Sequence, residues 1–80
     1  MTNDELETLR ETIHSYGFSP QVSLEIIEHI NSLSPKRRAI ILLALGGLNH
    51  HEIAKKLGIP RRTISDNISI ILPKLLPHPY

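Results

Sequence analysis

The sequence predicts an all-α fold, a small helical bundle of four to five helices, and two observations support this prediction. Apolar residues recur at spacings of three and four along most of the chain, and no stretch alternates apolar and polar residues as a half-buried strand does. Glycine and proline residues divide the 80-residue chain into five segments of helical length. A chain of this size makes one small domain, so residues 1–80 are expected to share a single, thin aliphatic core.

The first two segments are predicted to be one-sided helices. One runs from about Asp4 to Tyr16 and ends at Gly17. Ser19 and Pro20 open the next as N-cap and first helical residue, a position where proline's missing N–H is harmless. The apolar face of the first consists of Leu6, Leu9, Ile13 and Tyr16, and that of the second of Val22, Ile26, Ile27, Ile30 and Leu33.

The third segment is predicted to be the central helix of the bundle. Ser34-Pro35 repeats the same opening, and every residue from Ala39 to Leu45 is apolar. A half-exposed helix needs only one apolar stripe, so this segment is expected to be covered on most sides. Gly46-Gly47 ends it, with glycine supplying a left-handed cap.

Two further helices joined by a tight turn are predicted to form a helix-turn-helix. Asn49 and Glu52 have the spacing of a capping box at the start of the fourth helix. Ala54 is small enough to let two helices cross closely, and Gly58 permits the positive φ that the turn requires. Pro60 opens the fifth helix. The side chains expected to fix the crossing are Ile53, Leu57, Ile59, Ile64 and Ile68.

Charge is divided sharply along the chain. Residues 1–32 carry six acidic side chains and one basic one, whereas residues 33–80 carry eight basic and two acidic ones. Such a division suggests that the second half meets an anionic partner, although two solvated helix surfaces would give the same pattern. The apolar stripes of the acidic half are expected to enlarge the core of the helix-turn-helix, to form a dimer interface, or to do both.

Composition argues against several classes of protein. The chain has no cysteine, which rules out disulfides and thiolate metal sites, and no apolar run long enough to span a bilayer. We therefore expect a soluble, cytoplasmic protein. His50 and His51 are adjacent and point about 100° apart on a helix, so they do not make the i, i+4 pair of a metal site. No catalytic arrangement stands out, and we expect neither enzymatic activity nor a cofactor.

The second half resembles the helix-turn-helix domain of LuxR-type (GerE/FixJ-like) bacterial transcription regulators. The resemblance covers about residues 33–76 and includes the run GLNHHEIAKKLGIPRRTISDNISIILPKL from Gly47 to Leu75. Sigma-factor region 4 shares much of this pattern and is the nearest relative with which it can be confused. The resemblance implies a DNA-binding domain of bacterial or phage origin, in which the third helix is the recognition helix and the fourth often supports dimerisation.

Three positions depart from the LuxR-type pattern. Pro60 replaces a serine that would cap the recognition helix, and Arg37 replaces an acidic residue, so no capping box is expected at Ser34. Pro73 is expected to kink or end the last helix, which bears on how such a domain would dimerise. This last change leaves the DNA-reading face intact.

The resemblance also implies roles for individual residues of the recognition helix and its neighbour. The residues expected to face base edges are Arg62, Ser65, Asp66 and Asn67, and those expected to hold phosphates are Lys55, Arg61 and Thr63. Ala54, Gly58 and Ile64 are expected to serve the turn and its packing. The chemistry of the side chains agrees, because Arg can bond guanine, Asn adenine and Asp the N4 of cytosine.

These features predict a sequence-specific transcriptional regulator that binds double-stranded DNA with the helix starting near Pro60. A homodimer is expected, because two recognition helices about 34 Å apart would match a palindromic site. The alternative is a protein-binding adaptor or antagonist that pairs with a full-length regulator or with RNA polymerase. The basic pair Arg61-Arg62 favours DNA, since a pure adaptor has no need of it.

Overall fold

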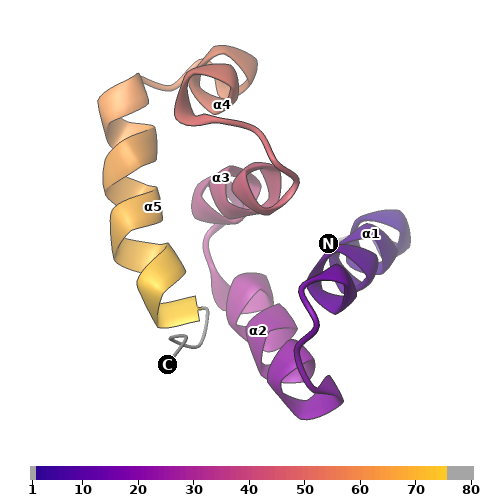
Figure 1. Cartoon of the computed structure of the whole chain (residues 1–80). Helices are drawn as coiled ribbons and strands as arrows, with labels where there is room; N and C mark the ends of the chain where they lie inside the picture. The colour runs from indigo at the N-terminus through magenta and orange to yellow at the C-terminus, as the bar shows by residue number, and fades with distance from the viewer. Residues whose placement is uncertain (1, 76–80) are drawn as a thin grey trace.

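The computed structural model describes residues 2–75, which form five α-helices (Figure 1). In chain order they are α1 (Asn3–Ser15), α2 (Pro20–Ser32), α3 (Pro35–Leu45), α4 (His50–Leu57) and α5 (Arg61–Leu75). No strand occurs among the described residues. The predicted all-α bundle is therefore confirmed, with five helices.

Helix α3 lies at the centre of the molecule and packs against α2, α4 and α5 (Figure 1). Ile40 and Ile41 on this helix are completely buried, and Leu45 is nearly so. Ala39 is partly buried, and Leu42, Leu43 and Ala44 are partly buried against the same core. The prediction of a central helix covered on most sides is confirmed.

The acidic half of the chain contributes to this core. Leu9 and Ile13 of α1 and Ile26 and Ile30 of α2 are buried in one cluster with the aliphatic residues of α3, α4 and α5. Helix α1 packs mainly on α2, and it reaches α3 through the Tyr16 hydroxyl, which donates to the carbonyl oxygen of Leu45 at 3.2 Å. The apolar stripes of residues 1–32 thus enlarge the core of the second half, which is the first of the two expected arrangements.

The helix starts follow from local chemistry. Ser19 caps α2 by accepting from the backbone N–H of Val22 at 3.3 Å, and Pro20 is the first helical residue, as predicted. The Thr2 hydroxyl caps α1 in the same way, so α1 begins and ends one residue earlier than predicted. Ser34 makes no side-chain cap bond, and Arg37 three residues later offers no acceptor for the reciprocal bond of a capping box.

The loop from α3 to α4 is a tight helix end built on two glycines. Gly47 has φ +99° and donates to the carbonyl of Ala44 at 3.1 Å, while Leu48 donates to the carbonyl of Leu43 at 3.2 Å. These two bonds satisfy carbonyls that the end of a helix leaves free. The left-handed glycine predicted for this position is Gly47, because Gly46 keeps a helical φ of −75°.

Pro73 does not end or divide α5, so the prediction that the last helix could end there is wrong. The helix continues past Pro73 to Leu75, the last described residue, as one run of 15 residues. Proline removes only the N–H that would bond the carbonyl of Ser69, and Ser69 is exposed, so water can satisfy that oxygen. Leu75 is buried in the core and anchors the last turn.

We predict that Gly47→Ala lowers the free energy of unfolding by about 1–2 kcal/mol, because an L side chain is strained at positive φ. No atom lies within 4 Å of a Cβ placed at Gly47, so the cost is conformational rather than a clash. Thermal unfolding followed by circular dichroism should show a fall of about 4–8 °C for each kcal/mol lost. Gly46→Ala is the matched control, and an equal fall in both variants would contradict this account.

Candidate nucleic-acid interface

A capping box fixes the start of α4. The side-chain oxygen of Asn49 accepts from the N–H of Glu52 at 2.8 Å, and the Glu52 carboxylate accepts from the N–H of Asn49 at 3.1 Å. Both free N–H groups are satisfied reciprocally, as the spacing predicts. The direction in which α4 leaves the loop is thereby set by local bonds.

The turn between α4 and α5 depends on a left-handed glycine. Gly58 has φ +66°, and the next residue, Ile59, donates to the carbonyl of Ala54 at 3.2 Å. Pro60 then precedes α5, and its carbonyl accepts the first helical bond, from Ile64, at 3.2 Å. Pro60 thus occupies the cap position one residue before the helix, and it has no side-chain acceptor to offer there.

The inner side of this helix pair is anchored in the core. Ile53 of α4 and Ile64 of α5 are completely buried, and Ile68 is buried one turn further on. Leu57 and Ile59 pack against the same cluster, as does Ala54. Because these side chains hold one face of α5 inward, the polar residues between them must lie toward its other side.

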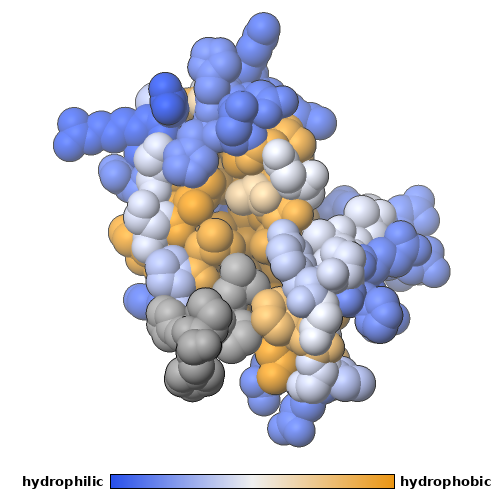
Figure 2. Space-filling view, viewed as in Figure 1, coloured by the Kyte–Doolittle hydropathy of each residue, from blue (hydrophilic) through white to orange (hydrophobic). Residues whose placement is uncertain are grey.

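The residues expected to contact DNA are open to approach. Arg61, Arg62, Asp66 and Lys55 are exposed, whereas Thr63, Ser65 and Asn67 are partly buried. Figure 2 shows hydrophilic side chains gathered over the end of the molecule where α4 meets the start of α5. Helix α1 lies on the other side of α3 from α5 and does not cover this end (Figure 1).

Two of the four residues expected at base edges already have hydrogen bonds within the protein. The Ser65 hydroxyl lies 2.8 Å from Nδ1 of His50, the first residue of α4. The Asn67 amide donates to the carbonyl of Thr63 at 2.8 Å, one turn back along α5. Each side chain keeps further capacity, since a hydroxyl has two lone pairs and one proton, and an amide has a second N–H and a carbonyl.

The contact of His50 with Ser65 is a feature of this surface that the sequence did not predict. The bond joins the two helices across 15 residues of sequence. No local spacing rule connects positions so far apart, and the adjacent His51 made the pair look like ordinary surface residues. The contact could have been predicted only by placing the start of α4 beside the second turn of α5.

Metal and membrane features are not found in the part of the chain that the structure describes. Between residues 2 and 75, no three His, Cys, Asp or Glu side chains come together in a group able to hold a metal ion. Over the same residues, none of the five helices combines the length and apolar character that crossing a bilayer requires. Nor does any side-chain nitrogen or oxygen buried there lack a hydrogen-bond partner.

Comparison with known families identifies the domain. The sigma-70 region 4 family matches residues 23–69, which span α2, α3, α4 and most of α5 and make up more than half of the chain. The chain belongs to the sigma-70 region 4 family. This region 4 domain is accordingly a helix-turn-helix DNA-binding fold of the transcription machinery, with α4 and α5 as its two defining helices.

The family match corrects the emphasis of the sequence prediction. The family found is sigma-factor region 4, the nearest relative with which the pattern can be confused, and the LuxR-type resemblance is not confirmed. The match begins within α2, about ten residues before the LuxR-type resemblance begins. Residues 1–22, about two thirds of the acidic N-terminal segment, lie outside the matched region. No curated protein and no solved structure matches this region 4 domain at a significant level.

The His50–Ser65 bond should contribute measurably to holding α4 against α5. We predict that His50→Ala and Ser65→Ala together cost less than the sum of the single changes, with a coupling energy of about 0.5–1.5 kcal/mol, the usual net value of one hydrogen bond. Urea unfolding of the four proteins in a double-mutant cycle measures this coupling. Strictly additive losses would mean that the two side chains do not bond in solution.

Proposed function

We propose that this region 4 domain is a sequence-specific transcriptional regulator that reads the major groove of double-stranded DNA with α5. The observation that carries the proposal is the uncovered polar face at the start of α5, backed by completely buried Ile64 and Ile53. A helix held rigidly from behind can present side chains at fixed positions, and the major groove of B-DNA, about 12 Å wide, admits an α-helix.

Four side chains of α5 are proposed to face the base edges. The side chains of Arg62 and Asp66 are exposed. They lie four residues apart, and therefore on one side of the helix. Arg can form two bonds with guanine, and Asp can accept from the N4 of cytosine. Ser65 and Asn67 are partly buried, and each would use the bonding capacity left over from its contact inside the protein.

The remaining cations are proposed to hold the phosphate backbone. Arg61 lies in the first turn of α5 and Lys55 in the last turn of α4, so they flank the turn from its two sides. Thr63 follows Arg61 by two residues; it is partly buried and can donate its hydroxyl to a phosphate. Such contacts set the position of the protein on the duplex and add affinity without sequence information.

A homodimer is proposed as the DNA-bound form, because a lone helix-turn-helix reads only one half-site. Leu24 on α2 and Ile70 on α5 are more than half exposed, at 54% and 61%, and offer apolar surface for contact between copies. Sedimentation velocity at tens of micromolar, with and without a palindromic duplex, measures the association. A monomer under both conditions would contradict the dimer while leaving DNA binding by a single copy open.

We predict that Arg62→Ala weakens binding to a selected site by about tenfold or more and relaxes the preference for the base pair that Arg62 contacts. The duplex is first selected from random sequence, and fluorescence anisotropy then measures affinity for the selected and mutated sites. Arg10→Ala is the matched control, because it removes the same charge from exposed α1, away from the interface. Equal losses from both substitutions would leave only a general charge effect.

Lys55→Ala is expected to weaken binding to all sequences alike. If Lys55 neutralises one phosphate, the slope of log affinity against log salt concentration should fall in magnitude by about one. A salt titration of the wild-type and Lys55→Ala proteins on the same duplex measures this.

The adaptor function is the alternative. It would be favoured if the protein retains no DNA at low salt and instead forms a stable complex with RNA polymerase or a regulator.

A further inference from the structure

His50 lies where α4 meets the proposed recognition helix. It is partly buried, and its Nδ1 lies 2.8 Å from the hydroxyl of Ser65 on α5. Ser65 follows Arg61 by four residues and Arg62 by three, so these three side chains lie on one side of α5. The imidazole of His50 therefore stands at the edge of the surface proposed to contact DNA.

The second ring nitrogen of His50, Nε2, is free to bond a ligand. It makes no hydrogen bond to another residue between 2 and 75, and no buried side-chain nitrogen in that range lacks a partner. Nε2 is therefore open to solvent. Because Nδ1 is engaged with Ser65, the ring is held in one orientation, and the direction in which Nε2 points is set with it.

The charges around His50 favour an anion as the ligand. Helix α4 and helix α5 together carry five cationic side chains and two carboxylates. The Glu52 carboxylate already accepts from the N–H of Asn49 at 3.1 Å. Helix α3, which also packs against α4, is apolar from Ala39 to Leu45 and carries its charges in its first turn. The charged and titratable residues of these three helices are Lys36, Arg37 and Arg38 of α3, His51, Glu52, Lys55 and Lys56 of α4, and Arg61, Arg62, Asp66 and Lys74 of α5.

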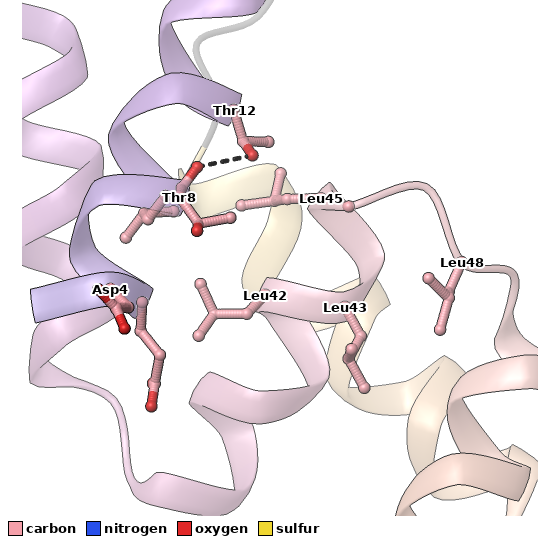
Figure 3. A pocket seen from close by; sticks show the side chains of 10 residues that line it. Asp4, Thr8, Thr12, Leu42, Leu43, Leu45 and Leu48 are labelled. Carbon is pink, nitrogen blue, oxygen red and sulfur yellow. Dashed lines mark hydrogen bonds between the residues drawn. The ribbon is translucent and has the colours of Figure 1, made fainter. Parts of the chain in front are cut away.

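The other side of α3 does not offer such a place. A hollow of about 400 Å³ lies there between α1 and α3, and Leu42 and Leu45 point into it (Figure 3). Asp4 and Glu5 of α1 line its edge and are exposed, and carboxylates repel phosphates. An anion is therefore expected at the end of the molecule where α4 meets α5.

A doubly protonated imidazole suits an anion at this place. Histidine changes charge between pH 5 and 8, and in its charged form both ring nitrogens donate. Nδ1 then donates to the Ser65 hydroxyl, and Nε2 can donate to the anion. In a helix-turn-helix the second helix enters the major groove while the first crosses the backbone, so the anion that α4 meets on DNA is a phosphate.

We propose that His50 is a proton-linked contact to DNA, whose charged ring bridges the hydroxyl of Ser65 and a phosphate. Binding of the duplex favours the charged ring and takes up a proton, so the domain binds DNA more tightly as the pH falls through the range in which histidine becomes charged. This inference rests on the proposed function, because it needs α5 in the major groove.

The affinity of the full chain for DNA at two pH values tests the proposal. On a duplex selected from random sequence, fluorescence anisotropy should show binding about three- to tenfold tighter at about pH 6 than at about pH 7.5, the scale of one partly exposed hydrogen bond between charged groups. The slope of log affinity against log salt concentration should be steeper at the lower pH by up to about 0.9, because one more phosphate is neutralised. Carboxylates and guanidinium groups keep their charge over this range.

His50→Asn separates the charge of the ring from its bond to Ser65. An asparagine amide can take the place of Nδ1 beside the serine hydroxyl, but it cannot take up a proton. The variant should bind DNA with affinities that agree within about twofold at the two pH values, and with the same salt slope. His14→Asn is the matched control on exposed α1, across α3 from α5 (Figure 1), and should keep the whole pH dependence.

Nuclear magnetic resonance of the ¹⁵N-labelled chain gives a second measurement that does not depend on affinity. Correlations between the ring nitrogens and the ring carbon-bound protons report the charge of each histidine. At about pH 7, the duplex should raise the charged fraction of His50 and leave that of His14 unchanged. If the bond to Ser65 only holds α4 against α5, no proton is taken up at His50 when DNA binds.

Three results would overturn the proposal while leaving DNA binding in place. The first is a wild-type affinity that is equal at the two pH values, and the second is a pH dependence that survives in His50→Asn. The third is a pH dependence that disappears in His51→Asn instead, since His51 is exposed and lies four residues before Lys55, on the same side of α4. A chain that binds no duplex at either pH would remove the proposed function, and this inference with it.

Discussion

Burial of Ile40 and Ile41 on α3 is the constraint from which the rest of the arrangement follows. A small chain with one phenylalanine and no tryptophan has few large side chains, so its aliphatic residues must share one core. Completely burying one isoleucine stabilises a fold by about 1.5–3 kcal/mol, and both of these are inaccessible to solvent. Helices α2, α4 and α5 each cover part of α3. The buried side chains of α5 lie on one face of that helix, so the core holds it from that face only.

The packing of α5 on the core through one face leaves its other face available for the proposed contacts with DNA. Ile64 and Ile68 hold the inner face of α5, and the basic and polar residues between them are left on the outside. Helix α1 closes the core on the other side of α3 from α5, so its carboxylates lie away from the start of α5 (Figure 1). The basic residues at the start of α5 are thus left uncovered.

Local chemistry explains what could be predicted from the sequence. The Ser19-Pro20 start, the capping box at Asn49 and the left-handed turn at Gly58 each depend on residues within four positions of one another, and each was found as predicted. The bonds that cross the fold, such as His50 to Ser65, span many residues and leave no periodic pattern. The family was harder still, because Ala54 and Gly58 satisfy the sterics of any tight helix-turn-helix and do not separate LuxR-type domains from region 4.

The contact between His50 and Ser65 makes the chemistry of one helix depend on the other. The serine hydroxyl has a single proton, and a neutral imidazole carries a proton on only one of its two nitrogens. When Nδ1 accepts, the serine proton points to α4 and its oxygen can only receive a bond from outside; when Nδ1 donates, the same hydroxyl is free to give one. A tautomer choice at the first residue of α4 thereby decides whether Ser65 presents itself to a ligand as an acceptor or as a donor.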